Sequence, residues 1–312
     1  MPKLHTRLTA LGSPCEFQLY GASKDQLDEV AAACASELGR IETKYSRYLD
    51  DSIVTRINQS AGTGTFTRLD DETKNLFAYA QTAFEQSDGL FDITSGVLRR
   101  AWDFKSGRLP NTDELRDLCK LVGWKRVEMR GEEIHLPRLG MEIDFGGFGK
   151  EYAADRLAGV CHQHGITSGL IDLGGDVCIV GPHPDGSPWL VGIRDPRDPE
   201  RAMASLPLSH GSLATSGDYE RFMEIDGKRY CHLLNPRTGW PITGIAGVSV
   251  VADQCLVAGT ATTIAMLKGH SGARWLEKLG LPYLWVDENR RTGGSLWPKR
   301  TPRNQSPETQ PS

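Results

Sequence analysis

Residues 141–181 read MEIDFGGFGKEYAADRLAGVCHQHGITSGLIDLGGDVCIVG, and this stretch decides the predicted fold. The apolar run at 141–145 predicts a strand, and a glycine-rich loop follows it. After Lys150 the apolar residues recur at helical spacing until Gly165, which predicts a helix. A strand, a glycine pair and another strand come next, so that IDLGG echoes the earlier IDFGG. This order is typical of a crossover unit and predicts a parallel strand pair within 141–180.

The chain before this stretch predicts one strand and several helices. Residues 6–20 alternate weakly between apolar and polar and predict a strand. The next segment opens with a capping box, Ser23 and Gln26, and its apolar residues keep the 3.6-residue period as far as Tyr45, which predicts a long helix. Further elements are expected at about 71–87 (helix), from near Thr112 (helix), and at about 125–129 and 133–136 (strands).

The chain after this stretch is rich in predicted strands. Alternating runs broken by Pro and Gly occupy 189–252, helices are expected at about 257–268 and 271–279, and PYLWV predicts a last strand. Hairpin-rich sequence argues against an all-parallel doubly wound sheet. We therefore expect an α+β (mixed α/β) fold, a single domain over 1–297 with helices packed on a twisted, partly antiparallel sheet. The polar tail, 298–312, predicts disorder.

Composition excludes several classes of function. The 36 Lys and Arg against 40 Asp and Glu give a net charge of -4, which makes nucleic acid an unexpected partner. The seven cysteines are scattered and include no C-x-x-C pair, which favours buried free thiols in a reducing compartment over zinc or disulfides. The chain has no signal-peptide pattern and no run of about 18 apolar residues, so we expect a cytoplasmic protein without membrane insertion. A leader removed beforehand would leave the same pattern.

The glycine loop of 146–149 fails two known phosphate-binding patterns. A dinucleotide fingerprint requires a glycine where Tyr152 stands, and a P-loop requires Ser or Thr where Glu151 stands. Small residues, backbone N–H groups at a helix start and Lys150 still suit an anion. The alternative is a tight strand-to-helix turn with a solvated lysine.

Six motifs, taken in order, resemble the ApbE-type FAD:protein FMN transferases from about residue 6 to 290. The motifs are SRYLDDSIVTRIN (46–58), GLFDITSG (89–96), IDFGGFGKEYAAD (143–155), LIDLGGDV (170–177), LATSGDYERFMEIDGKRYCHLLNPRTGWPI (213–242) and VAGTATTIAMLKG (257–269). The resemblance implies an enzyme that cleaves FAD, joins FMN by a phosphoester to a Ser or Thr of a target flavoprotein and releases AMP. It also implies Mg2+, which would neutralise charge on the leaving phosphate.

The resemblance assigns three roles within the loop itself. Asp144 matches a carboxylate that contacts FAD, and Lys150 matches a catalytic lysine that faces the pyrophosphate. The carbonyl of Gly147 matches a backbone ligand of the metal, which would explain a small residue there. The alternative for the two charged residues is an exposed turn Asp and a solvated lysine.

Four further residues match positions beside the nucleotide. Phe91 and Asp92 match a flavin or ribose contact, although a core phenylalanine next to a capping aspartate is an alternative. Tyr48 matches an aromatic position that could stack on a ring, with a core tyrosine at a helix end as the alternative. His232 matches a catalytic histidine near the phosphates, and its alternative is a structural histidine.

The sequence departs from the family in the helix expected to bind the metal. The family pattern there is roughly ADALATA, whose Asp and Thr lie four residues apart on one helical face and can share a cation. This chain has AGTATTI, which keeps Thr263 but places Gly259 where the Asp would be. We expect the loss of this anionic ligand to weaken the metal site, because hard cations prefer carboxylates. Asp253 lies too far along the chain to replace it on that face.

Three functions therefore stay open from the sequence. The first is FMN transfer to a protein, with altered metal dependence. The second is FAD hydrolysis to FMN and AMP, in which water replaces the protein hydroxyl. The third is an FAD-binding accessory protein or FAD store that has lost catalysis together with its aspartate.

Overall fold

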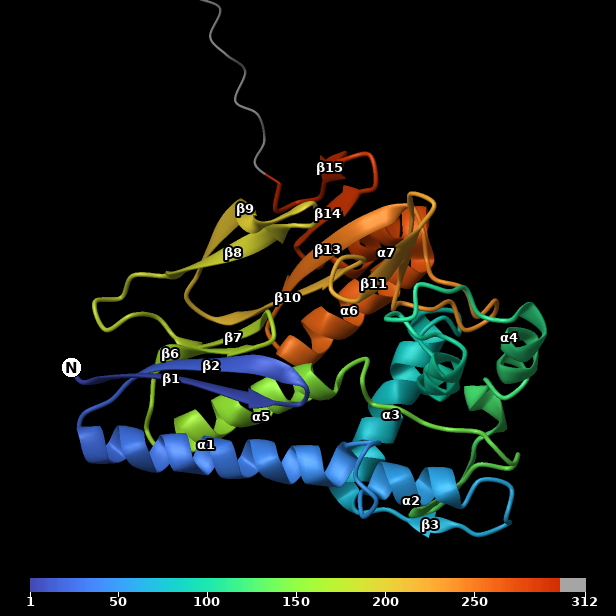
Figure 1. The fold of residues 1–312 in the computed structure, drawn as a ribbon. Helices are drawn as coiled ribbons and strands as arrows, with labels where there is room; N and C mark the ends of the chain where they lie inside the picture. The colour runs from blue at the N-terminus through green and yellow to red at the C-terminus, as the bar shows by residue number, and fades with distance from the viewer. Residues whose placement is uncertain (298–312) are drawn as a thin grey trace, which may run out of the picture.

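An antiparallel sheet of eight strands forms the centre of the computed structural model, which describes residues 1–297 (Figure 1). In spatial order its strands are β1 (Lys3–Ala10), β2 (Ser13–Tyr20), β6 (Ser168–Leu173), β7 (Asp176–Gly181), β10 (Gly211–Gly217), β13 (Ile245–Ala252), β14 (Tyr283–Asp287) and β15 (Thr292–Gly293). Every neighbouring pair in this sheet is antiparallel. The predicted α+β class, with helices packed on a sheet, is confirmed; the sheet, predicted to be partly antiparallel, is antiparallel at every pair.

Three helices cover one face of this sheet: α1 (Lys24–Tyr45), α5 (Gly149–Gln163) and α6 (Cys255–Lys268) (Figure 1). The predicted cap of α1 is confirmed, because the Ser23 hydroxyl accepts the Gln26 N–H and the Gln26 side chain accepts the Ala22 N–H. The buried face of α1 follows the predicted period, from Leu27 to Tyr45. This layer fixes where α5 and α6 begin.

A two-stranded ribbon, β8 (Trp189–Asp195) and β9 (Asp198–Leu208), packs on the opposite face of the sheet. Strand β7 shows how both faces are buried, since its side chains alternate between two apolar clusters. Cys178 and Val180 belong to the cluster under the helices, while Val177 and Ile179 belong to the cluster under β8. Alternate residues of a strand point to opposite faces, so the centre of the sheet is apolar on both sides.

The remaining elements extend the fold beside α6. They are α2 (Ile53–Gln59), β3 (Thr67–Arg68), α3 (Asp71–Gln86), the 3-10 helix η1 (Ile93–Arg100), α4 (Thr112–Cys119), η2 (Trp124–Arg126), β4 (Glu128–Arg130), β5 (Glu133–His135), β11 (Phe222–Ile225), β12 (Lys228–Cys231), η3 (Gly269–Ser271) and α7 (Gly272–Leu279). Predicted helices at 71–87, near Thr112, at 257–268 and at 271–279 are confirmed, as is the strand-rich stretch 189–252.

Two strand predictions are wrong, and the strand predicted at about 125–129 is correct only in part, because η2 covers its start and β4 begins at Glu128. Residues 6–20 form a hairpin rather than one strand, because Leu11 and Gly12 adopt positive φ angles of 52° and 68° and turn the chain. The turn lacks the Asn-Gly or Asp-Gly signal that marks most such hairpins.

The predicted strand at 141–145, and with it the parallel pair within 141–180, is also wrong. The backbone of this segment bonds to helices instead of a strand: the Asn58 side chain of α2 pairs with both backbone groups of Ile143, and the Asp144 N–H donates to the carbonyl of Ile93 at the start of η1. Its apolar side chains are buried. The strands that follow, β6 and β7, pair antiparallel.

Three other predictions concern the chain as a whole. All seven cysteines are free thiols, and six of them are buried, as predicted. No helix within residues 1–297 is long and apolar enough to cross a bilayer. The predicted tail at 298–312 lies outside the described residues, and the domain boundary at residue 297 stays a prediction.

Candidate active site

Lys150 lies in the first turn of α5, beneath the turn that joins β6 to β7. Its Nζ donates to Oδ2 of Asp176 at 2.9 Å, and a Cβ added at Gly174 would lie 3.6 Å from this Nζ. Lys150, three residues after IDFGG, therefore meets the glycine pair of IDLGG. Burial lowers the pKa of Lys150, but the carboxylate of Asp176 outweighs it and the pKa is raised. Lys150 is thus a fixed positive charge, not the solvated lysine of the alternative interpretation.

The N-terminus of α5 is open to an anion. Within residues 1–297 no side chain caps it, and Phe148 occupies the cap position, but the N–H of Gly149 already donates to the Phe145 carbonyl at 2.7 Å. The first N–H groups of a helix lack partners inside the helix and carry its positive dipole end. Together with Lys150, these groups form a site of the kind that binds phosphates.

Glu151 follows Lys150 and is the site residue that the sequence interpretation missed. Its side chain is 7% exposed, and its Oε2 finds no hydrogen-bond partner among the described residues. Burial, with the neighbouring charge of Asp176, raises the pKa of Glu151 to about 8. The helical period was a usable signal, because Glu151 is in register with the buried Ala154 and Ala158.

The Glu151 carboxyl lies directly against Gly259 of α6. A Cβ added at Gly259 would lie 2.4 Å from Cγ and 2.6 Å from Oε1 of Glu151. A carboxyl group from α5 thus fills the space beside Gly259, and a weakened metal site stays a prediction. Thr263 lies one turn further along the same face of α6, and its hydroxyl is 3.2 Å from the Ser216 hydroxyl of β10.

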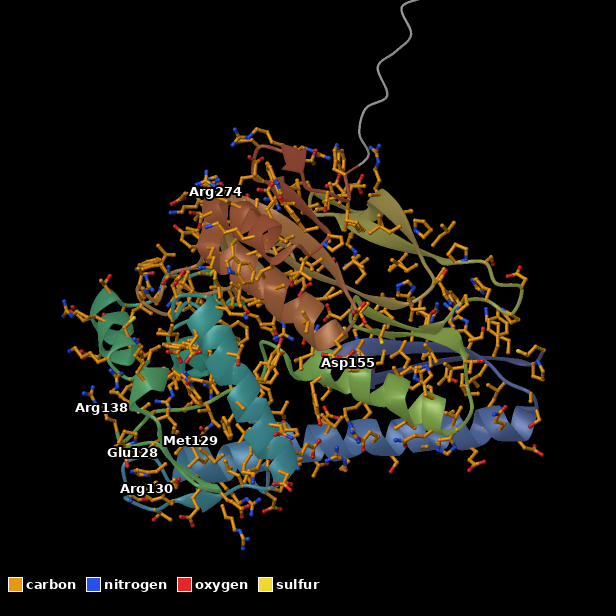
Figure 2. The ribbon with its side chains drawn as sticks, turned by 180° about the vertical axis from the view of Figure 1, so that it is seen from behind. Glu128, Met129, Arg130, Arg138, Asp155 and Arg274 are labelled. Carbon is orange, nitrogen blue, oxygen red and sulfur yellow. The ribbon has the colours of Figure 1, made fainter. Side chains whose placement is uncertain are left out.

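Asp155 fixes the position of α6 against α5. Its two carboxylate oxygens accept the N–H groups of Cys255 and Leu256, at 2.7 and 2.9 Å, and so cap α6 from the neighbouring helix. Figure 2 shows Asp155 on α5 where the two helices meet. An aspartate cap of this kind typically stabilises a helix by about 1 kcal/mol. The contact between Glu151 and Gly259 is therefore built into the packing of two helices.

Asp144 and Tyr48 form the other end of the site. Asp144 makes an ion pair with Arg47 and accepts the Gly146 N–H at 2.9 Å. The Arg47 guanidinium lies 4.8 Å from the ring centre of Tyr48, whose side chain is 74% exposed. The alternative of Tyr48 as a core residue is therefore wrong, although the Arg47 guanidinium already occupies one face of its ring. Arg47 is a second residue that the sequence interpretation missed.

Phe91 and Asp92 support the loop from behind. Phe91 is buried, stacks with Phe148 at 6.1 Å, and would lie 3.1 Å from a Cβ added at Gly147. Both oxygens of Asp92 are in use, Oδ1 by the Thr94 N–H and Oδ2 by the Trp124 N–H. Their direct contact with a nucleotide stays a prediction, while their structural roles, the alternative interpretation, are evident.

His232 directly follows β12 and pairs with the backbone of Arg221. Its backbone N–H donates to the Arg221 carbonyl at 2.9 Å, and its Nδ1 lies 3.3 Å from the same oxygen. Burial lowers the pKa of His232 to about 4, and the charges of Arg221 and Lys150 act in the same direction. Desolvation would raise the pKa of the Tyr48 phenol. The hydrogen bond from Arg47 and the positive charges of Arg47, Arg99 and Arg221 outweigh it, so this pKa is lowered. Arg221 is therefore close enough to act on both His232 and Tyr48, and Lys150 is close enough to act on His232.

Replacing His232 with glutamine tests its neutral state. The unfolded chain protonates this histidine near pH 6.5, but the folded protein does so only near pH 4. The unfolded state binds the extra proton, so stability is lost as the pH falls through this window. In His232→Gln we expect this loss to shrink by about 1–2 kcal/mol, with allowance for partial exposure. Urea unfolding at pH 7 and pH 4.5 measures it, with His270→Gln, an exposed histidine, as the control. An identical loss in His232→Gln and wild type would contradict a neutral, buried His232.

Comparison with known proteins gives one consistent result. The model of the ApbE family matches residues 11–285. The FAD:protein FMN transferase of Treponema pallidum is 28% identical and aligns over 91% of this chain and 84% of its own length. One from Klebsiella pneumoniae is 30% identical, over 90% of this chain and 88% of its own.

Solved structures agree with these relatives. The crystal structure of the ApbE protein from Thermotoga maritima superposes with a TM-score of 0.87, at 29% identity, over 94% of this chain and 97% of that one. The apo crystal structure of the flavinyl transferase ApbE from Pseudomonas stutzeri gives 0.83, at 26% identity, over 94% and 95%. With a family match across most of its length and the same fold around Lys150 and His232, the chain belongs to the ApbE family.

Proposed function

We propose that this protein is an FAD:protein FMN transferase, which cleaves FAD, joins FMN to a Ser or Thr of a target flavoprotein and releases AMP. The observation that carries the proposal is the charged Lys150 at the uncapped start of α5, with neutral His232 nearby. A diphosphate suits this place, because a lysine and free helix N–H groups bind phosphate oxygens. The relatives named FAD:protein FMN transferase support the same activity.

The residues divide the work in this proposal. Lys150 holds the pyrophosphate of FAD, and the exposed ring of Tyr48 stacks on one of its aromatic groups, with Arg47 and Asp144 setting its position. The acceptor hydroxyl attacks the phosphorus of the FMN half, the new O–P bond forms, and the P–O bond to AMP breaks with its electron pair leaving on the AMP phosphate.

His232 is suited to take the proton of the acceptor hydroxyl. Its Nδ1 faces a carbonyl, which can only accept, so the proton of the neutral ring lies on Nδ1 and Nε2 is free to accept. The negative charge of a bound pyrophosphate would raise the low pKa of this ring and make it a better base. The proton then has a defined destination during phosphoryl transfer.

The residues present also fit a magnesium ion. The fit rests on the unpartnered buried Oε2 of Glu151, on the Thr263 hydroxyl, and on the carbonyl of Gly147, to which no hydrogen bond is found among the described residues. Residues 1–297 contain no group of three or more His, Cys, Asp or Glu arranged for a metal, so phosphate oxygens of FAD would have to complete the ligands. A bound cation supplies neutralisation of the charge that grows on the leaving phosphate.

A mass-spectrometric assay tests the proposed function. The protein is incubated with FAD, magnesium and candidate flavoprotein domains, and we expect an FMN-sized mass increase on the acceptor together with an equal amount of AMP. The control is the same acceptor with its modified Ser or Thr replaced by Ala. Release of AMP without an adduct would instead identify an FAD pyrophosphatase. FAD binding with neither product would identify an accessory protein. The identity of the acceptor and a cytoplasmic location stay predictions.

A further inference from the structure

A buried carboxylate without a partner needs a physical reason. Glu151 is 7% exposed, and its Oε2 accepts no hydrogen bond from any described residue. Leaving a buried carboxyl oxygen unsatisfied costs on the order of 1–3 kcal/mol, so such groups are retained where something else binds them. The nearest positive charge, Lys150, is hydrogen-bonded to Asp176 rather than to Glu151.

The space beside Gly259 holds the Glu151 carboxyl, and a second carboxylate on α6 would collide with it. Any side chain at Gly259 would enter the space of the Glu151 Cγ, at 2.4 Å, and the Asp155 cap keeps the two helices from separating. The pair therefore excludes a second carboxylate, and a glutamate on α5 and a glycine on α6 belong together. The carboxyl of Glu151 stands where a side chain at Gly259 would begin, one helical turn from Thr263.

The surroundings favour a cation over a further protein donor. Asp176 and Glu220 lie near enough to Glu151 to oppose its ionisation, against the one positive charge of Lys150. A carboxylate, a hydroxyl on α6 and the unbonded carbonyl of Gly147, four residues before Glu151, are all hard oxygen ligands. Magnesium and manganese prefer such oxygens.

We propose that Glu151 supplies, from α5, the carboxylate that binds a divalent cation in this site, in place of one on α6 that Gly259 cannot provide. The role of this cation in cleaving FAD rests on the proposed function, but its binding does not. In the family pattern the carboxylate belongs to the helix that here carries Gly259, whereas in this chain Glu151 would supply it from α5.

Cation binding can be measured without turnover. Mn2+ is titrated into the whole protein and followed by electron paramagnetic resonance, and Mg2+ by calorimetry, each with and without FAD and with no acceptor present. We expect Glu151→Gln, which keeps the shape and removes the charge, to weaken Mn2+ binding by about tenfold or more. Glu220→Gln is the matched control, which removes a nearby charge away from Gly259, and we expect less than about a threefold change.

An exchange of the two residues gives a sharper test. Gly259→Asp alone should lower the melting temperature, since its side chain meets Glu151. The double variant Glu151→Gly with Gly259→Asp removes this conflict and should restore Mn2+ affinity to within about threefold of wild type, because the carboxylate has returned to the same face. Restored affinity only in the double variant would support a shared site.

The outcomes separate this inference from the proposed function. It is overturned if wild type binds no Mn2+, or if Glu151→Gln binds Mn2+ as wild type does, in which case Glu151 only fills space. If wild type binds Mn2+ through Glu151 but transfers no FMN, the proposed function fails and the inference stands. If FMN transfer is observed while Glu151→Gln keeps full Mn2+ affinity, the proposed function stands and the inference fails.

Discussion

Replacing Lys150 with methionine is expected to reduce FMN transfer at least about 100-fold, because the pyrophosphate would lose the fixed positive charge that faces it in a partly buried site. The lysine is fixed in place, since its Nζ is held 2.9 Å from Asp176 under the β6–β7 turn. Its raised pKa keeps it protonated at neutral pH. Single-turnover assays with FAD and an acceptor measure the loss, and calorimetry measures the fall in FAD affinity.

A second variant separates loss of function from loss of stability. Lys150→Met leaves Asp176, which is 4% exposed, as an unpaired buried carboxylate, and we expect a cost of about 2–4 kcal/mol in the free energy of unfolding. Adding Asp176→Asn removes that charge and should recover most of the stability but none of the transfer. Lys24→Met, at an exposed lysine, is the control for both measurements. Transfer at the wild-type rate in Lys150→Met would refute a role for this lysine in the reaction.

Local sequence signals predicted the helices of this fold well. The cap at Ser23 and the period from Leu27 to Tyr45 contain all that α1 needs, because its hydrogen bonds lie within the segment. The same holds for α3 and α5, whose buried faces are regular. A helix is decided by residues within a few positions of each other, so a single sequence carries the information.

Pairing between distant segments could not be predicted in the same way. The apolar side chains of 141–145 are buried, but Asn58 and Ile93 hold the backbone of this segment instead of a neighbouring strand. A strand and an extended loop with one buried side have the same pattern, and only the partner distinguishes them. The direction of the β6–β7 pair likewise depends on the glycine pair after Leu173, which closes a tight turn.

The sequence predicted only those site residues that match a family motif position. Lys150 and His232 lie in motifs, and the structure brings them to one region. Glu151 and Arg47 were missed, because their importance depends on what faces them. A glutamate after a lysine and a glycine in a helix are unremarkable separately, and become informative only when α5 and α6 are packed together.

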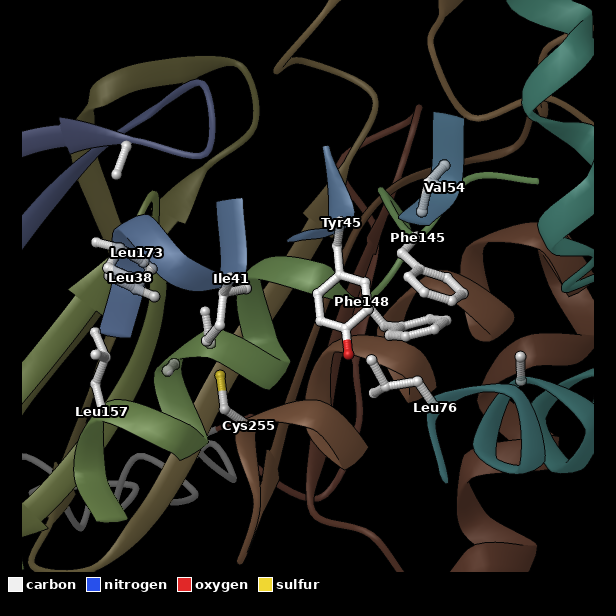
Figure 3. Packing of buried hydrophobic residues seen from close by; sticks show 14 of the residues in the cluster. Leu38, Ile41, Tyr45, Val54, Leu76, Phe145, Phe148, Leu157, Leu173 and Cys255 are labelled. Carbon is white, nitrogen blue, oxygen red and sulfur yellow. The ribbon is translucent and has the colours of Figure 1, made fainter. Parts of the chain in front are cut away.

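Replacing Phe148 with alanine is expected to cost about 3–5 kcal/mol in the free energy of unfolding, the usual range for a fully buried aromatic ring. Phe148 is 0% exposed, and its ring lies 5.1 Å from Phe145, 5.7 Å from Tyr79 and 6.1 Å from Phe91. Figure 3 shows Phe145 and Phe148 packed beside Tyr45 in the cluster under the helices. The ring precedes α5 directly, so it anchors the loop that carries Gly147 and Lys150.

Urea unfolding of three variants tests this anchor. Phe148→Leu keeps much of the volume and should cost only about 1–2 kcal/mol, while Leu190→Ala, whose side chain is 76% exposed on β8, should stay within about 0.5 kcal/mol of wild type. FMN transfer should fall further in Phe148→Ala than the folded fraction explains, because a cavity beneath the loop lets Lys150 move away from the pyrophosphate. A Phe148→Ala protein that loses less than about 1 kcal/mol, or that keeps wild-type transfer per folded molecule, would show that the loop is positioned by its own backbone and by Asn58 rather than by this ring.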